Sequence, residues 1–222
     1  MTIHVGMLLY PGLTQLDLTG PFELLHRVPD AKMHLAWKTL DPVVADSGLT
    51  LVPSTTLADC PKLDVVFVPG GTGQTELMED PTVLGFLRDH GSGARWVTSV
   101  CTGSLLLGAA GLLAGYEAAT HWAFMDLLPL FGAKPVRRRV VVDRNRVTGG
   151  GVTAGIDFGL RIAAELAGED FARALQLGLE YDPEPPFRSG HPDVAEPALV
   201  ARVRAGFDER RRARAEIAAR RG

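Results

Sequence analysis

Three short apolar runs recur along the chain, and each is followed by a segment with helical spacing. These pairs are Ile3–Tyr10 before Gln15–Leu25, Val65–Val68 before Pro81–Arg88, and Trp96–Val100 before Thr102–Ala110. Alternation of strands and helices is typical of a mainly parallel sheet covered by helices on both faces. We therefore predict an α/β fold in which such a sheet lies between two helical layers.

Length and composition indicate one globular unit. The 222 residues are 46% hydrophobic and 22% charged, with a formal net charge of -3. A chain of this size fits one large domain or two small ones, and no repeat or low-complexity linker divides it. We predict a single domain over 1–222, in which residues from about 188 to 222 form a C-terminal helical extension.

The same features exclude several classes of partner. No bulk positive charge is present to recruit nucleic acid or acidic lipid. Glycine, proline or charge interrupts every apolar stretch before it could span a bilayer, and the first residues lack a basic leader region. We expect a cytoplasmic protein with no membrane or nucleic-acid partner.

The C-terminal part changes character at Tyr181–Phe187, where prolines and carboxylates follow an aromatic and no helix can continue. From Ala195 onward a helical pattern resumes with interleaved glutamates and several arginines: Arg202, Arg204, Arg210, Arg211, Arg212 and Arg214. A basic helix can bind acidic partners, but the interleaved acids favour a solvated or oligomer-packing face.

Cys101 is the candidate nucleophile. It lies between the strand-like run ending at Val100 and the small, polar residues that begin the next helical segment. This pattern predicts an elbow that presents a side chain at a helix N-terminus, where unpaired N–H groups lower a thiol pKa. A free cysteine is also often a buried structural residue, and the sequence leaves the two interpretations even. The other cysteine, Cys60, lies in a loop-like context and is interpreted as structural.

Ligands of parallel α/β sheets bind beyond the carboxyl ends of the strands. This rule predicts one shared rim for the loop 11–17, the loop Pro69–Gly73 and the Cys101 elbow. The glycine-rich loop lacks a nucleotide-binding spacing, but its amides could form an anion-binding wall beside Cys101. Residues 140–148 resemble a hairpin that leads into glycines 149–151 and a helix over Thr153–Ala167.

Asp17 and His121 are the polar candidates for proton transfer. Asp17 could be a cap or a first-turn acid of the helix that follows the first strand, or it could serve as a general acid with a raised pKa beside the thiol. His121 is the histidine to test as a base, although a structural role is favoured. The other histidines show no metal-ligand spacing, and we predict no metal.

Several segments resemble the DJ-1/PfpI superfamily: the elbow Val100-Cys101-Thr102-Gly103-Ser104, the stretch from Gly111 to Trp122, and Pro69-Gly70-Gly71. The resemblance implies a flavodoxin-like sandwich, also shared by class I glutamine amidotransferases, with a strained nucleophile elbow. Much of the superfamily has a glutamate near the cysteine, whereas Asp17 here and the segment Tyr181–Phe187 resemble the branch that hydrates isonitriles. Thr102 stands where hydrolytic members have a histidine.

This resemblance implies an enzyme that converts isonitriles to N-substituted formamides through a thioimidate on Cys101. Asp17 would supply a proton and Thr102 would orient the sulfur or the carboxyl by a hydrogen bond. Gly71 and Gly150 would shape the substrate pocket. No cofactor is needed because only water and protons move, and family members imply a homodimer.

Two alternatives stay open. A ligand-sensing relative of AraC-type regulators carries the same cysteine and Thr-His-Trp motifs, although the stretch after Phe187 is too short for the usual DNA-binding pair. A redox-responsive or chaperone-like DJ-1 relative would also use a reactive cysteine.

Overall fold

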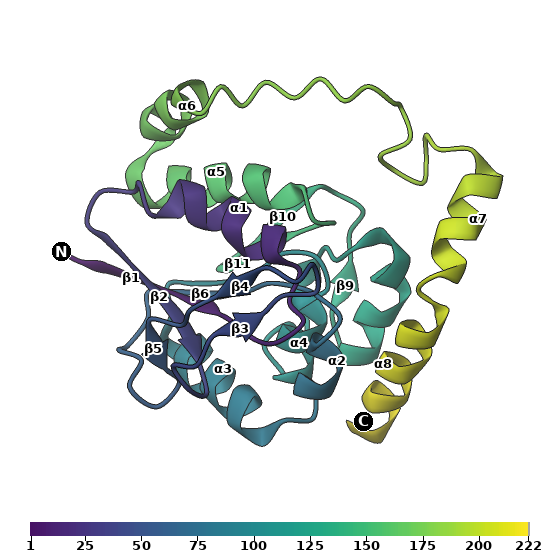
Figure 1. Ribbon diagram of the computed structural model, residues 1–222, viewed down its shortest axis with the longest axis horizontal. Helices are drawn as coiled ribbons and strands as arrows, with labels where there is room; N and C mark the ends of the chain where they lie inside the picture. The colour runs from purple at the N-terminus through teal and green to yellow at the C-terminus, as the bar shows by residue number, and fades with distance from the viewer. Residues whose placement is uncertain (222) are drawn as a thin grey trace.

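A seven-stranded sheet forms the centre of the protein in the computed structural model, which describes residues 1–221 (Figure 1). The strand order is β10-β11-β7-β6-β1-β2-β5, and only the β10–β11 pair is antiparallel. The strands are β1 (Ile3–Leu8), β2 (Ala31–Trp37), β5 (Thr55–Thr56), β6 (Val65–Val68), β7 (Trp96–Ser99), β10 (Val140–Asp143) and β11 (Arg146–Gly149).

Helices cover both faces of this sheet. Helices α1 (Gln15–Leu25) and α5 (Ala154–Ala167) pack together on one face, while α3 (Pro81–Gly93) and α4 (Gly103–Ala109) lie on the other. All four residues of β6 are buried, as expected for a strand with helices on both sides. The predicted α/β fold is therefore confirmed.

The smaller elements lie at the periphery. Strands β3 (Val43–Val44) and β4 (Thr50–Leu51) form an antiparallel pair, and β8 (Glu117–Ala118) pairs in parallel with β9 (Lys134–Pro135). The remaining helices are α2 (Gln74–Leu77), the 3-10 helix η1 (Trp122–Phe131), α6 (Glu169–Gly178), α7 (Pro197–Ala205) and α8 (Asp208–Arg221). Within residues 1–221, no helix has the length and apolar character needed to cross a bilayer.

The three predicted strand and helix pairs are all present, with shifts of a few residues at their ends. Helix α3 continues to Gly93, and the helix predicted from Thr153 begins at Ala154. The hairpin is confirmed: Arg144 and Asn145 connect β10 to β11, and Arg144 adopts a positive φ of 53°. Strand β2 and helix α6 were not predicted as elements.

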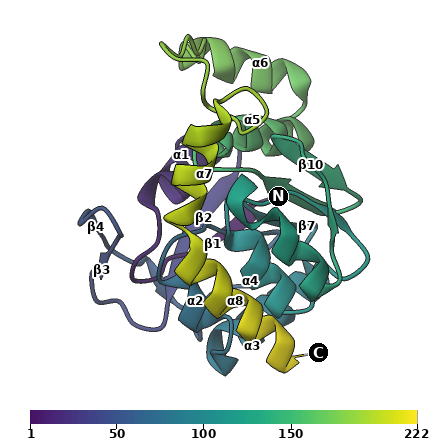
Figure 2. The ribbon, with the colours of Figure 1, turned by 90° about the vertical axis from the view of Figure 1, so that its right-hand side faces the viewer.

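The C-terminal tail runs along the body of the molecule. Figure 2 shows α7 and α8 crossing the side where α2 and α4 lie. Helix α8 contacts η1 and α2, and Phe207, which precedes it, packs against the rings of His121, Trp122 and Phe124. The interpretation of the arginines as a solvated or oligomer-packing face is wrong for Arg214, which is 1% exposed.

Candidate active site

Cys101 forms the predicted elbow between β7 and α4, with a φ of 56°. A non-glycine residue in this left-handed conformation costs roughly 1 to 2 kcal/mol, so surrounding contacts must hold it. Its N–H donates to the carbonyl oxygens of Gly150 (2.7 Å) and Gly149 (3.2 Å). Its own carbonyl accepts from the Thr120 hydroxyl at 2.9 Å. These hydrogen bonds hold the backbone of the elbow at both the N–H and the carbonyl of Cys101.

Glycines make room for this turn. A Cβ at Gly103 would lie 2.1 Å from the carbonyl oxygen of Val68, and one at Gly70 would lie 2.7 Å from the nitrogen of Thr102. Any side chain at either position would displace the backbone of the elbow. Glycine is therefore required at positions 70 and 103, because the ends of β6 and β7 approach each other closely there.

The three loops meet at one rim, as the sequence predicted. The end of β6 lies between β1 and β7, so the loop Pro69–Gly73 contacts both neighbours. Leu13 forms a bridge with Gly71, and the Thr14 N–H donates to the carbonyl of Gly70 at 3.0 Å. Residues from three separate parts of the chain consequently surround Cys101.

Asp17 is buried completely in the first turn of α1. It is not the helix cap, since that position belongs to Thr14. The Gly70 N–H donates to its Oδ2 at 2.9 Å, and the Cys101 thiol lies close enough to interact with the carboxyl, although no donor within residues 1–221 reaches the buried Oδ1 at full hydrogen-bonding geometry. Burial raises the pKa of Asp17 to about 7, as expected of a general acid.

The thiol of Cys101 differs from the sequence expectation. Burial and the neighbouring Asp17 carboxylate raise the pKa of Cys101, although the N–H of Thr102 and the charge of Arg214 act to lower it. The helix N-terminus was expected to dominate, but a thiol that is 6% exposed loses most of its hydration. The prediction of a lowered pKa is wrong for this site, and because Cys101 and Asp17 interact directly, their titrations are coupled.

Thr102 lies at the N-cap of α4 and is buried. Its hydroxyl accepts from the Gly71 N–H at 3.4 Å, a long hydrogen bond, while its backbone N–H interacts with the Cys101 sulfur. We expected the side chain to orient the sulfur or the carboxyl. The structure places the hydroxyl on the glycine loop, and its role in orienting the sulfur or the carboxyl stays a prediction.

The glycine loop is mostly committed to internal contacts. The Gly70 N–H binds Asp17, and the Gly73 N–H donates to the carbonyl of Gly12 at 3.1 Å. The proposed anion-binding wall is therefore wrong for these two amides. Gly71, at a φ of 144°, has the weaker contact with Thr102 and stays the candidate of this loop for substrate binding.

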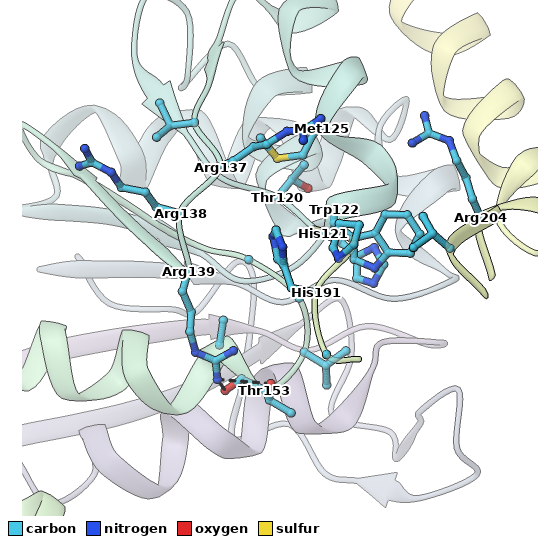
Figure 3. Close-up of a pocket in the computed structure, with 18 residues that line it drawn as sticks. Thr120, His121, Trp122, Met125, Arg137, Arg138, Arg139, Thr153, His191 and Arg204 are labelled. Carbon is cyan, nitrogen blue, oxygen red and sulfur yellow. Dashed lines mark hydrogen bonds between the residues drawn. The ribbon is translucent and has the colours of Figure 1, made fainter. Parts of the chain in front are cut away.

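A cavity of about 630 Å³ is lined by the residues that Figure 3 draws as sticks. Gly150 and Thr120, which hold the backbone of Cys101, belong to its lining, but Cys101 and Asp17 do not. Arginines from the 137–139 segment and Arg204 line its rim, where Arg137, Arg139 and Arg204 pair with carboxylates. Gly150 thus lies between the elbow and the cavity, while its contact with substrate stays a prediction.

His121 is held in a structural environment. Its Nδ1 accepts from the Ala123 N–H at 3.3 Å, and its ring packs against Phe207 and Phe124. Burial and the charges of Arg214 and Arg210 lower its pKa to about 4, so the ring is neutral at pH 7. These contacts support the structural interpretation.

Arg214 was missed as a site residue. Helix α8 brings its guanidinium to the glycine loop, where Nη2 donates to the carbonyl of Gly71 at 2.8 Å. The sequence contained no local signal for this contact, because the arginine is one of several in a polar helix. Within residues 1–221 no group of three or more potential metal ligands occurs.

The DJ-1/PfpI family profile matches residues 4–165, and the chain belongs to this family. The chain is 57% identical to the isonitrile hydratase of Pseudomonas putida over 204 residues, which are 92% of this chain and 90% of that protein. The crystal structure of a ThiJ/PfpI family protein from Pseudomonas syringae superposes with a TM-score of 0.96 at 45% identity, covering 98% of this chain and 91% of that one.

A regulator is more distant. The HTH-type transcriptional regulator GbdR of Pseudomonas aeruginosa is 30% identical over 80% of this chain, and the match covers 50% of that regulator.

Proposed function

We propose that this chain is an enzyme that adds water to isonitriles, R–N≡C, and releases N-substituted formamides. The identity of 57% over 92% of the chain to an isonitrile hydratase carries this proposal. The site adds a chemical reason. It places a nucleophile on a strained elbow beside a buried carboxyl whose pKa is about 7.

In the proposed reaction, the Cys101 thiolate attacks the terminal carbon of the isonitrile. Asp17 donates a proton to the same carbon, which gives a thioimidate, R–N=CH–S–Cys101. Asp17 suits this step because its carboxyl is fully buried beside the Cys101 thiol and interacts with it directly. A carboxyl with a pKa of about 7 is protonated in a large fraction of molecules at neutral pH.

Hydrolysis of the thioimidate completes the cycle. Water adds to the thioimidate carbon, the nitrogen gains a proton, and a tetrahedral adduct forms. Its collapse creates the formyl C=O, breaks the C–S bond and returns the remaining proton to the Cys101–Asp17 pair. One water has then been added, with one hydrogen on carbon and one on nitrogen, so no oxidant or reductant is consumed.

The test is turnover of a small aromatic isonitrile, followed by its ultraviolet absorbance and by identification of the formamide with mass spectrometry. Wild type should produce formamide, and Cys101→Ala should not. Cys60→Ala is the matched control, because it removes the other cysteine away from the elbow and should keep turnover. Formamide production by Cys101→Ala would refute the mechanism, and no turnover by wild type would refute the activity on that substrate.

We also propose the domain organisation, the oligomeric state and the location of the protein. Residues 1–222 form one domain with the part from about 188 onward as its extension, an arrangement supported by Arg220 pairing with Glu79 and by Arg211 pairing with Asp126. A homodimer stays a proposal that rests on the family resemblance, and a cytoplasmic location stays a proposal that rests on the two free cysteines, which fit a reducing compartment. Sedimentation at micromolar concentration tests the dimer, which a single monomeric species would exclude.

A further inference from the structure

Arg214 is a buried cation with no carboxylate partner within residues 1–221. The ion pairs that α8 makes in this range involve Arg211 and Arg220 instead. Arg214 is 1% exposed, so water does not hydrate its charge. A buried charge of this kind is costly unless an opposite charge lies nearby.

Hydrogen bonds fix the guanidinium against the glycine loop of the site. Nε donates to the Thr75 hydroxyl at 3.0 Å, and Nη2 donates to the Gly71 carbonyl at 2.8 Å. The guanidinium carbon Cζ lies over the ring of Phe124, 4.8 Å from the ring centroid. The third nitrogen, Nη1, is buried and meets no acceptor within residues 1–221. Two hydrogen bonds therefore fix the guanidinium in place, and Nη1 is the donor nitrogen without an acceptor among these residues.

The groups around this cation include the nucleophile. Its charge acts on Cys101 and Tyr10, and both interactions favour the charged form of Arg214. Tyr10 is neutral, because burial raises the pKa of its hydroxyl, which donates to the Pro69 carbonyl at 2.8 Å. Arg210 on α8 opposes the charge of Arg214. Cys101, which interacts directly with Asp17, is therefore the ionisable group near Arg214 that can supply a negative charge.

The pair itself has further charged neighbours. Asp46 raises the pKa of Asp17, and His121 is neutral beside Arg214. Burial lowers the pKa of Arg214 only to about 10, so it stays charged at neutral pH. The site therefore contains one fixed positive charge, that of Arg214, together with three acidic groups, Cys101, Asp17 and Asp46.

We propose that Arg214 is a positioning residue that supplies the counter-charge for a single negative charge shared by Cys101 and Asp17. The proposal deepens the proposed function and rests on it. A pair with one negative charge and one proton is the state that the reaction requires, since thiolate attack and proton donation occur at the same carbon. Helix α8 thereby completes the active site from the C-terminal extension.

The test measures the ionisation of Cys101 without substrate. The thiolate absorbs in the ultraviolet, and the difference between each protein and its own Cys101→Ala version isolates this thiol. All variants carry Cys60→Ala, so that the other cysteine contributes nothing. Arg214→Gln should raise the pH midpoint of thiolate formation by about one unit or more, as expected for loss of a nearby opposite charge. This is about a tenfold loss of thiolate below the midpoint.

Two variants separate charge from packing. Arg214→Lys keeps a cation on α8 and should hold the midpoint within about half a unit of wild type, which also tests the proposal if the glutamine variant does not fold. Arg211→Gln removes the anchor of the same helix to Asp126 and should leave the midpoint unchanged. An unchanged midpoint in folded Arg214→Gln, a rise of one unit or more in folded Arg214→Lys, or an equal shift in Arg211→Gln would overturn the proposal.

The same variants should be assayed for isonitrile turnover across pH. The rising limb of kcat/KM should move with the thiolate midpoint in Arg214→Gln. Absence of turnover in wild type would refute the proposed function and leave the titration as the test of the counter-charge. A shifted titration with an unshifted activity profile would overturn the role of Arg214 in the reaction.

Discussion

The buried carboxyl of Asp17 should make the stability of this protein depend on pH. Burial raises the pKa of Asp17 from 3.8 to about 7 in the folded chain. Below about pH 4 the carboxyl is protonated in both the folded and unfolded states, and above about pH 7 it is ionised in both. Between these limits the folded chain binds the proton more tightly, so the free energy of unfolding falls as pH rises.

The size of this effect follows from the pKa difference. One pH unit corresponds to about 1.4 kcal/mol, so the interval gives about 4 kcal/mol at most. Coupling to Cys101 shares the charge between two groups and reduces the part that belongs to Asp17 alone. We therefore expect a loss of about 2 to 4 kcal/mol between pH 4 and pH 8.

Asp17→Asn removes this titration and keeps the shape of the side chain. Urea unfolding at each pH gives the free energy of wild type minus that of the variant, and this difference should fall by the amount above and level off beyond pH 7. Asp182→Asn, at an exposed position in the segment after α6, is the matched control and should give a flat difference. A change below about 1 kcal/mol for Asp17→Asn would refute the burial argument.

Two further substitutions test the geometry of the rim. Gly70→Ala places a methyl group 2.8 Å from Oδ2 of Asp17 and should lower kcat of isonitrile turnover at least tenfold, whereas Gly85→Ala, whose Cβ meets nothing within 4 Å in α3, should keep activity and raise the melting temperature. Equal kcat values for Gly70→Ala and Gly85→Ala would show that turnover does not depend on the close packing around Gly70. Thr102→Val removes the acceptor of the Gly71 N–H and should lower turnover about tenfold, with Thr102→Ser restoring it; an unaffected valine variant would remove the hydroxyl from the mechanism.

Local patterns were sufficient for the elbow. The apolar run before Cys101 and the small residues after it predicted a strand, a turn and a helix, and the φ of 56° agrees. The rule that ligands bind beyond the carboxyl ends of parallel strands then placed Asp17 and the glycine loop at the same rim. Neighbours along the chain encode these features, because strand and helix periods depend on adjacent residues.

Burial and charge could not be predicted in this way. The thiol pKa was expected to fall because the helix N-terminus is visible in the sequence, but the loss of hydration at Cys101 depends on what the whole fold places around it. The amide of Gly70 was expected to face an anion from outside, and it binds Asp17 instead.

The sequence by itself determined the fold class, the elbow and the nucleophile candidate, because each depends on short-range periodicity and on residue type. Only the tertiary structure decided that Asp17 is buried beside the Cys101 thiol, that the Gly70 N–H binds Asp17, and that Arg214 from the tail reaches the site. The sequence does not distinguish Arg214 from the other arginines of this polar helix. Its burial is set by how α8 packs against distant elements, and that depends on contacts far apart in the sequence.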